Sequence, residues 1–394
     1  MELSCKVQEY DWGKRGSQSA VAQLLKKRNL DVKIDECKPY AELWMGTHVN
    51  APSIIKETGE LLSDYIDKNP KVLGEKVAEI FNNQLPFLFK ILSVNKALSI
   101  QAHPTKQHAI ELNKKFPDIY KDPNHKPEMA IALTPFEAMC GFRNPREIRE
   151  FITHLPELEN ITRSKDEVDD VKFLEKSFRA ILTCEKDLVA KTIESLKTRF
   201  ANLEKCERDK YLSSLLDKLN SQFPNDNGVL MVYFLNYIKL QPSEAIYLAA
   251  NKPHAYIYGD CVEMMASSDN VVRAGLTPKL RDVQTLLTML DYTEDLTQDS
   301  RFKPQVENEY TTLYKPPVQE FAVVRIKLPK SIRKYTIPKR DSASIIIVID
   351  GTGKSVDKEV VPGLILFLAA QEVLEIIEVY SESILMYQGF TNVE

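Results

Sequence analysis

The chain has 394 residues, of which 43% are hydrophobic and 27% charged, and its formal net charge is -4. This composition is typical of a soluble globular protein, and the length exceeds what a single hydrophobic core fills, so we expect two or three domains. A bulk charge this close to neutral does not indicate a surface for nonspecific binding of nucleic acid or anionic membranes.

The cysteines and the first residues bear on the cellular compartment. Six cysteines lie far apart without a CxxC pair, and Met1–Cys5 lacks the basic and apolar regions of a signal peptide. No apolar run approaches the length that spans a bilayer. We therefore expect a cytoplasmic protein with free thiols and no disulfide framework.

The N-terminal part of the chain mixes helical and strand patterns. A short helix is expected near Val21–Leu25, and a second helical stretch over 57–83. The apolar run Phe87–Val94 is short and bounded, which is typical of a buried strand. Lys90 lies inside that run, where burial costs desolvation energy unless the ammonium meets an anion. The alternative is a lysine that extends to the strand edge.

The stretch Lys96–Pro104 alternates small or apolar residues with polar ones, as a strand does. Ser99, Gln101 and His103 would share one face of that strand. Two neighbouring side chains on one strand face, each with a lone pair, can bind a metal from a rigid platform. The alternative is a strand edge whose histidine is hydrogen-bonded and precedes a turn-forming proline.

Helical and strand patterns then alternate. Residues 104–118 are expected to form a helix and 119–126 a loop, followed by a strand over Pro127–Leu133 with Glu128 near its start. Between about 144 and 227, apolar residues recur at helical spacing, and the polar positions are rich in Lys and Glu. We interpret this segment as a helical module lodged inside a β-rich chain.

Strand patterns return after the helical module. The turns between the last runs contain glycine and proline, and many short strands of this kind favour a jelly roll or barrel. The runs expected to form strands are Val232–Leu240, Ala245–Ala249, Val318–Leu328, Ser344–Ile349 and Leu364–Leu368, with a polar tract at 292–312 between the second and the third.

The histidines indicate where a metal could bind. All six lie in the first two-thirds of the chain, so the C-terminal β unit is not expected to hold a histidine-ligated metal. A single site elsewhere would draw on His103, His254 and an acidic residue. Imidazole, carboxylate and a neutral oxygen donor suit zinc, and also iron or manganese.

Several motifs of four or more residues resemble the type I mannose-6-phosphate isomerase family and occur in that family's order. They are spread over most of the chain, which makes a chance match very improbable. The motifs are Tyr10–Gly13, Ser99–Pro104, His125–Glu128, Pro253–Tyr256 and Asp269–Lys279.

The resemblance implies a mainly β fold of two cupin-like jelly-roll units with an α-helical domain inserted in the first. This agrees with the alternation of β and helical patterns along the chain. Residues 1–143 and 228–300 would form the catalytic unit, 144–227 the helical insert, and 301–394 a C-terminal unit without metal.

The resemblance also implies one zinc ion per chain. In the family a glutamine, two histidines and a glutamate bind the metal, and these residues correspond to Gln101, His103, Glu128 and His254. An arginine that is regarded as catalytic in the family corresponds to Arg273.

The reaction implied is the reversible interconversion of D-mannose 6-phosphate and D-fructose 6-phosphate. It moves a proton between C1 and C2 through a cis-enediol, and needs a base and positive charge beside the enediolate. Arg273 could supply the charge, or form a structural salt bridge with a carboxylate. Residue type leaves four candidates for the base or proton transfer, namely Glu263, Asp269, His125 and Lys126.

The phosphate of such a substrate needs hydrogen-bond donors away from the metal. Ser99, Lys90 and Lys279 are the candidates, with Lys106 behind them. Tyr256 follows His254 at strand spacing and is expected to line the pocket, although a place in the core is an ordinary fate for a tyrosine.

The expected partner is therefore a small sugar phosphate, with no nucleic acid and no membrane, and a monomeric chain. The implied role is to supply mannose 6-phosphate for GDP-mannose synthesis and mannosylation. Two other classes of protein use similar residues. One is a sugar-phosphate-binding cupin without catalysis, and the other is an iron-dependent oxygenase with the same ligands.

Overall fold

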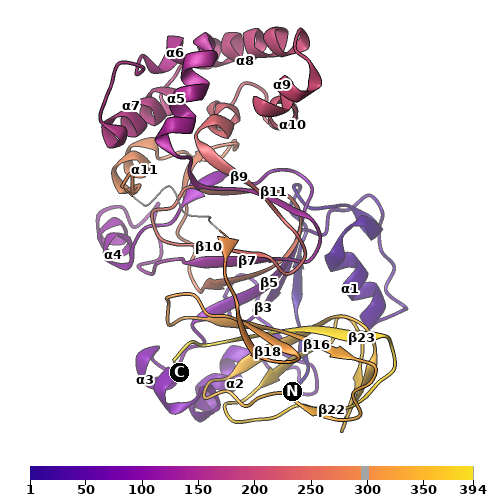
Figure 1. The fold of residues 1–394 in the computed structure, drawn as a ribbon. Coiled ribbons are helices and arrows are strands. Elements are labelled where there is room, and N and C mark those ends of the chain that lie inside the picture. Colours follow the sequence, from indigo (N-terminus) through magenta and orange to yellow (C-terminus); the bar gives the residue numbers. More distant parts are fainter. Residues whose placement is uncertain (294–300, 394) are drawn as a thin grey trace.

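The computed structural model describes residues 1–293 and 301–393. In Figure 1 the chain forms a helical module at the top, a large sheet assembly in the middle and a second β unit at the bottom, where both termini lie. This arrangement agrees with the order of β and helical patterns in the sequence. The expected boundary after residue 300 falls at the segment 294–300, which lies outside the described residues.

The middle assembly is organised around one long strand, β11 (His254–Ala266). Its first half pairs with β6 (Ile100–Ala102) and β8 (Phe136–Phe142). Its second half pairs with β5 (Phe87–Val94) and β7 (Glu128–Ala132). Strands from distant parts of the sequence therefore meet along β11.

The partners of β11 change at Gly259. This residue has a φ of +114°, and a Cβ atom there would lie 2.5 Å from the carbonyl oxygen of Pro135. Only glycine tolerates both the backbone angle and the close approach. The strand thus turns from one group of partners to the other, with His254 in its first half and Glu263 in its second.

The remaining strands of the middle assembly extend it at its edges. β10 and β13 lie beyond β7, β3 and β2 lie beyond β5, β12 pairs with β6, and β9 pairs with β8. These strands are β2 (Lys6–Gln8), β3 (Glu42–Met45), β9 (Leu235–Leu240), β10 (Ala245–Leu248), β12 (Val272–Gly275) and β13 (Arg301–Phe302). Because β13 pairs with β10, the middle assembly includes two residues beyond the domain boundary that was expected after residue 300.

The helical module forms where apolar residues recur at helical spacing. Its helices begin after Asn144, whose side chain accepts a hydrogen bond from the backbone N–H of Arg146, with Pro145 at the first helical position. The predicted stripe that includes Phe178 and Ile181 is fully buried. The helices are α5 (Pro145–His154), α6 (Pro156–Thr162), α7 (Asp170–Leu182), α8 (Lys186–Ala201), α9 (Lys205–Lys210) and α10 (Ser213–Gln222).

The C-terminal unit contains two sheets, and apolar residues from both form one core, which includes Ile346 and Ile376. One sheet has the order β14 (Gln305–Asn308), β15 (Thr311–Tyr314), β16 (Ala322–Pro329), β23 (Ser383–Phe390), β18 (Ser344–Asp350) and β21 (Ile365–Leu368). The other has the order β17 (Tyr335–Thr336), β22 (Glu375–Val379), β19 (Gly353–Ser355) and β20 (Glu359–Val360).

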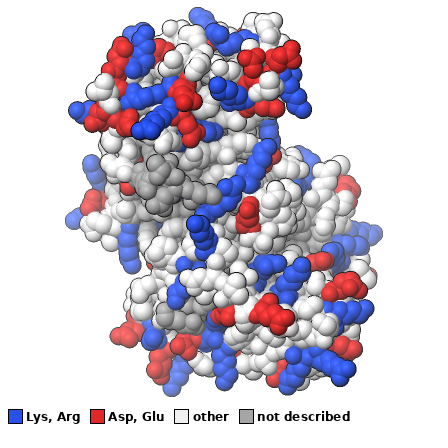
Figure 2. Space-filling view, viewed as in Figure 1, with Lys and Arg blue, Asp and Glu red and all other residues white. Residues whose placement is uncertain are grey.

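A second apolar core joins the middle assembly to the C-terminal unit. Phe89 and Val262 of the former pack in one cluster with Val323 and Ile345 of the latter. The surface view in Figure 2 shows Lys and Arg mixed with Asp and Glu over the helical module and over the C-terminal unit, in keeping with the small net charge.

Short elements complete the fold. They are β1 (Leu3–Ser4), η1 (Gly16–Gln18), α1 (Ala20–Arg28), β4 (Ile54–Ile55), α2 (Leu62–Lys68), η2 (Pro70–Leu73), α3 (Glu75–Ile80), α4 (Lys106–Lys115), η3 (Asn227–Tyr233) and α11 (Val283–Met289). Among the described residues, every helix of the protein is too short or too polar to span a bilayer.

Several predicted elements were wrong in extent, and the strands expected over Lys96–Pro104 and Val318–Leu328 are limited to Ile100–Ala102 and Ala322–Pro329. The helical stretch over 57–83 breaks into α2, η2 and α3, because Pro70 cannot continue α2 and Gly74 has a φ of +92°. A Cβ on Gly74 would lie 2.1 Å from the carbonyl oxygen of Asp341, so the chain turns there against the C-terminal unit. The strand expected from Val232 begins only at Leu235, after the turn of η3.

Candidate metal centre and active site

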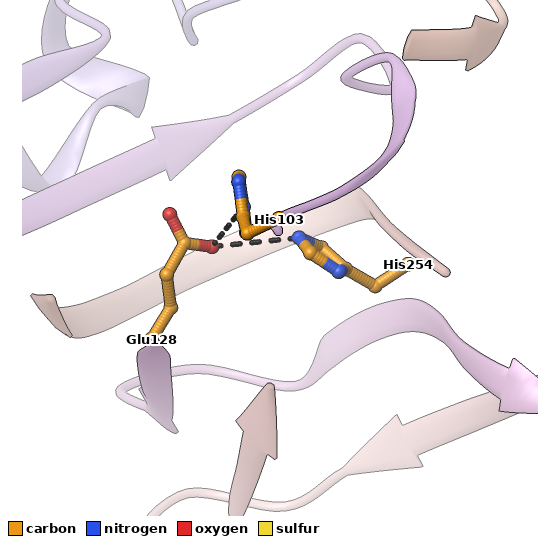
Figure 3. Close-up of side chains that lie close together, drawn as sticks. All are labelled: His103, Glu128 and His254. Atoms are coloured by element: carbon orange, nitrogen blue, oxygen red, sulfur yellow. Dashed lines mark ion pairs between the residues drawn. The ribbon is translucent and has the colours of Figure 1, made fainter. Parts of the chain in front are cut away.

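Three buried side chains converge at one point: His103 directly follows β6, Glu128 begins β7 and His254 begins β11. Glu128 Oε2 lies 3.4 Å from Nε2 of His103 and 3.4 Å from Nε2 of His254, as Figure 3 shows. The three side chains are at most 2% exposed, and among the described residues none of these three atoms has a hydrogen-bond partner. An unsatisfied buried polar atom costs about 1–3 kcal/mol, so this cluster fits a bound cation.

Each imidazole is oriented by a backbone carbonyl. His103 Nδ1 lies 2.6 Å from the carbonyl oxygen of Asn270, and His254 Nδ1 lies 2.9 Å from that of Lys252. A proton on Nδ1 that is donated to the carbonyl leaves the lone pair of Nε2 free for a metal. Burial lowers the pKa of His103 to about 4, which keeps its ring neutral at pH 7.

The carboxylate of the cluster is ionised. Burial raises the pKa of Glu128, but the ammonium of Lys126 and the ring of His103 outweigh it, so that the pKa lies well below its ordinary value. Lys126 Nζ contacts Glu128 Oε1 at 2.8 Å, which leaves Oε2 directed at the two histidines. Two neutral imidazoles and one carboxylate are a donor set that zinc prefers.

Gln101 lies beside this cluster. In the sheet register it is opposite His254 on β11 and opposite Arg273 on β12, and opposed residues point to the same face. Its neighbours Ile100 and Ala102 are fully buried, so the predicted alternation is confirmed within Ile100–Ala102, whereas Ser99 and His103 lie outside the strand. The position suits an amide oxygen as a fourth ligand.

The cluster adjoins a cavity of about 750 Å³. The glutamate of the cluster, Gln101 and most of the other predicted site residues line it. These are Lys90, Ser99, Lys126, Tyr256, Glu263, Asp269, Arg273 and Lys279. His125 is not among the lining residues, because its ring pairs with Glu320 of the C-terminal unit.

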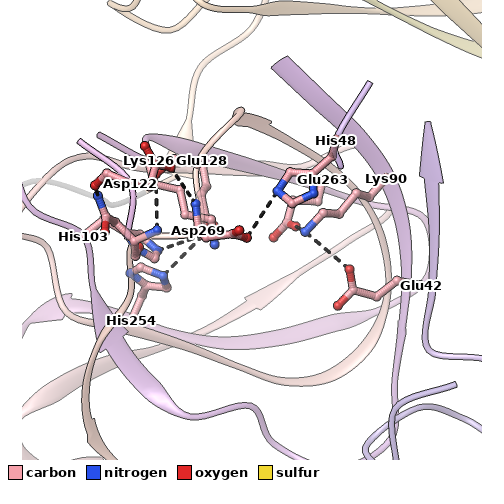
Figure 4. Close-up of polar contacts among 12 residues, drawn as sticks. Glu42, His48, Lys90, His103, Asp122, Lys126, Glu128, His254, Glu263 and Asp269 are labelled. Atoms are coloured by element: carbon pink, nitrogen blue, oxygen red, sulfur yellow. Dashed lines mark hydrogen bonds and ion pairs between the residues drawn. The ribbon is translucent and has the colours of Figure 1, made fainter. Parts of the chain in front are cut away.

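A buried lysine joins two carboxylates at the cavity. Lys90 Nζ lies 3.1 Å from Glu263 Oε2 and 3.3 Å from Glu42 Oε2, and 4.8 Å from the centre of the Trp44 ring. Burial lowers the pKa of Lys90, but the two carboxylates raise it by more, so that the net pKa is raised and the lysine is charged. Figure 4 shows Lys90 between these partners, on the opposite side of the site from the metal cluster.

The two acidic candidates for the base differ in environment. Burial and the charges of Glu128 and Glu42 raise the pKa of Glu263 despite the neighbouring Lys90. A hydrogen bond from His48, at 3.2 Å, instead lowers the pKa of Asp269. The environment of Glu263 therefore favours the protonated carboxyl group, whereas that of Asp269 favours the ionised one.

Tyr256 keeps its proton. Burial and the charges of Glu263 and Glu128 raise its pKa well above the ordinary value. Its hydroxyl is buried near Glu263, and the residue lines the cavity, as the sequence predicted.

Cations without a carboxylate partner form another part of the cavity lining. Within residues 1–293 and 301–393, Arg273, Lys96 and Lys279 make no ion pair, although all three line the cavity. The structural salt bridge considered for Arg273 is therefore not found in the part of the chain that the structure describes. Lys96 Nζ lies 4.4 Å from the centre of the ring of Phe223, the residue that directly follows the last helix of the helical module.

Sequence reasoning missed two of these residues. Lys96 is the first residue of the alternating stretch, and its charge three residues before Ser99 is the signal that the sequence offers. Glu42 is the anion that a buried Lys90 requires, but the pairing of β3 with β5 that brings them together spans distant parts of the chain.

Comparisons with known proteins agree along the whole chain. Residues 1–145 match the family model of the phosphomannose isomerase type I catalytic domain, 150–235 that of its helical insertion domain, and 312–354 that of its C-terminal part. A mannose-6-phosphate isomerase from Bos taurus is 42% identical over 98% of this chain and 97% of its own length. The one from Homo sapiens is 44% identical over 89% of this chain and 87% of its own length.

Solved structures give the same result. The apo form of mannose 6-phosphate isomerase from Salmonella typhimurium matches with a TM-score of 0.85 and 29% identity, covering 100% of this chain and 99% of that one. A mannose 6-phosphate isomerase bound with zinc and yttrium matches equally, with a TM-score of 0.85 and 29% identity. Family models for three parts of the chain and relatives along nearly all of it show that this protein belongs to the type I phosphomannose isomerase family.

Proposed function

We propose that the chain is a zinc-dependent aldose–ketose isomerase that interconverts D-mannose 6-phosphate and D-fructose 6-phosphate through a cis-enediol. The observation that carries this proposal is the cluster of His103, Glu128 and His254, whose inward atoms are buried and unpaired beside a cavity with unpaired cations. With Gln101 these residues would hold one zinc ion per chain. A bound zinc ion supplies Lewis acidity toward the substrate oxygens on C1 and C2.

The residues of the chain supply the proton transfer. Glu263 is the proposed base, because it lines the cavity and its pKa is raised toward the pH at which a general base works best. Glu263 also pairs with Lys90, but its pKa is raised, whereas a hydrogen bond from His48 lowers the pKa of Asp269. Lys126 pairs with the proposed metal ligand Glu128. His125 pairs with Glu320 and does not line the cavity.

Arg273 is the proposed electrostatic partner of the enediolate. Burial lowers its pKa, but a guanidinium stays protonated at neutral pH. Because no carboxylate in the described residues neutralises it, its charge is available to an oxyanion that forms in the cavity.

The phosphate is the proposed partner of Ser99, Lys279 and Lys96. Ser99 lies two residues before Gln101. Ser99, Lys279 and Lys96 all line the cavity. Lys90 is omitted from this set, because its charge is already shared by two carboxylates at 3.1 and 3.3 Å. A cation in that environment has little charge to offer to a phosphate.

Membership of the family supports the wider setting. The proposed enzyme is a cytoplasmic monomer built from two cupin-like jelly-roll units, residues 1–143 with 228–300 and residues 301–394, with a helical insert over 144–227. Its reaction supplies mannose 6-phosphate for GDP-mannose synthesis and mannosylation.

Elemental analysis combined with an isomerase assay tests the zinc proposal. We expect one zinc ion per chain, loss of mannose 6-phosphate isomerisation after chelation, and recovery when zinc is added back. Full activity in protein shown to be free of metal would overturn the proposal.

A further inference from the structure

Asn270 connects the metal cluster to the loop that leads to Glu128. The residue lies between β11 and β12, just before the strand that carries Arg273, and only 3% of its surface is exposed. Its carbonyl oxygen accepts the hydrogen bond from His103 Nδ1 at 2.6 Å. Its side-chain nitrogen donates to the carbonyl oxygens of Asp122 at 2.6 Å and Asn124 at 2.7 Å.

Further hydrogen bonds tie the same two segments together. The hydroxyl of Ser268 donates to the carbonyl oxygen of Asn124 at 3.0 Å and accepts the backbone N–H of Asn270 at 3.2 Å. The backbone N–H of Asp269 donates to Asp122 Oδ2 at 2.9 Å. The segment 268–270 therefore holds the loop over residues 122–124 from several sides.

These contacts determine how two metal-binding side chains lie relative to each other. The loop continues from Asn124 through Lys126 to Glu128, whose carboxylate must reach the two histidines. The ring of His103 is held by the backbone of Asn270, while the loop is held by the side chain of the same residue. Partners that orient metal ligands change metal affinity by about 10–100-fold when they are removed.

The amide of asparagine is suited to this role, because its two N–H bonds can reach two acceptors at once. Alanine at position 270 would leave both loop carbonyls without this donor. An aspartate would place a carboxylate oxygen against two carbonyl oxygens, which repel it.

We infer that Asn270 is a positioning residue for the zinc site, which fixes the loop carrying Glu128 relative to the ring of His103. It does not itself contact the metal or the substrate. This inference rests on the zinc-dependent function proposed above, and it concerns geometry and affinity rather than the chemical step.

Asn270→Ala in the full-length protein tests the inference, with Asn227→Ala as the matched control. Asn227 is also a buried asparagine, 2% exposed, whose side chain donates to carbonyl oxygens, at 2.7 Å for Ile181 and 2.9 Å for Cys184. It lies in the helical module, so its removal lowers stability without touching the metal cluster. Zinc affinity is measured by competition with a chelator.

We expect Asn270→Ala to bind zinc about 10–100-fold more weakly than the parent, and Asn227→Ala to bind it within twofold. The absorption spectrum of the Co²⁺-substituted protein should change in Asn270→Ala only, because it reports the arrangement of the ligands. Equal zinc affinity and equal spectra for parent and Asn270→Ala would overturn the inference.

Ser268→Ala keeps the test decisive if Asn270→Ala does not fold. It removes one hydroxyl from the same set of contacts, so a smaller loss of zinc affinity in the same direction is expected, and an unchanged affinity counts against the inference. If the parent protein binds no zinc, the proposed function itself fails. If the parent binds zinc and Asn270→Ala binds it equally, only the positioning role fails.

Discussion

Replacing Arg273 by alanine is the sharpest test of the proposed chemistry. The side chain is half-buried and forms no ion pair in the described residues, so its removal breaks no salt bridge. A guanidinium about 3 Å from an enediolate oxygen stabilises it by about 5.5 kcal/mol at an effective dielectric constant of about 20, against about 1.4 kcal/mol in water. The difference of about 4 kcal/mol corresponds to about a thousandfold in kcat.

The assay is steady-state isomerisation of mannose 6-phosphate, with zinc content measured on the same samples. We expect Arg273→Ala to lose about a thousandfold in kcat and to keep its zinc, and Arg273→Lys to fall between, because it keeps the charge but not the planar fork. Arg325→Ala is the matched control, since Arg325 is also half-buried on a strand without an ion pair in the described residues. Retention of more than a tenth of kcat by Arg273→Ala, or loss of its zinc, would refute the reasoning.

Three further substitutions test other parts of the cavity and fold. Lys90→Met should lower the free energy of unfolding by about 3–5 kcal/mol in urea titrations, because two buried carboxylates lose their cation; a loss under about 1 kcal/mol contradicts the pairing. Lys96→Met should raise the KM for mannose 6-phosphate with kcat nearly unchanged, as for a contact made equally in ground and transition states. Burial raises the pKa of Glu320 and His125 lowers it, and the net effect is a pKa below 4.5. The free energy of unfolding that this carboxylate contributes is therefore present above pH 4.5 and should be lost as the pH falls. Unfolding titrations at several pH values should show that Glu320→Gln lacks this loss, and equal pH slopes for the parent and Glu320→Gln would contradict the prediction.

The sequence predicted the metal cluster because much of its information is local. Gln101 lies in β6, His103 directly follows that strand, and Glu128 opens the next strand. What brings His254 to them is long-range, since it depends on β11 pairing with β6 in its first half and with β7 in its second. The positions of the histidines already made His254 a candidate, whereas the motif resemblance supplied Gln101 and Glu128 as the other ligands.

The errors in the fold have the same origin. The stretch over 57–83 has the apolar spacing of one helix, but Pro70 and Gly74 divide it where the chain meets Asp341 of the C-terminal unit. Local spacing does not contain that contact. The helical module was predicted more closely, because each of its longer helices carries an apolar stripe at helical spacing that is buried.

The proton-transferring residue could not be chosen from the sequence, because residue type leaves its pKa undetermined. Glu263 and Asp269 are both carboxylic acids at the cavity, yet burial raises the pKa of one and His48 lowers that of the other. Lys90 at 3.1 Å would by itself keep Glu263 ionised, but it is shared with Glu42, whose charge also opposes ionisation of Glu263. The pKa of Glu263 is therefore raised first by burial and then by the charges of Glu128 and Glu42, and none of these can be read from residue type.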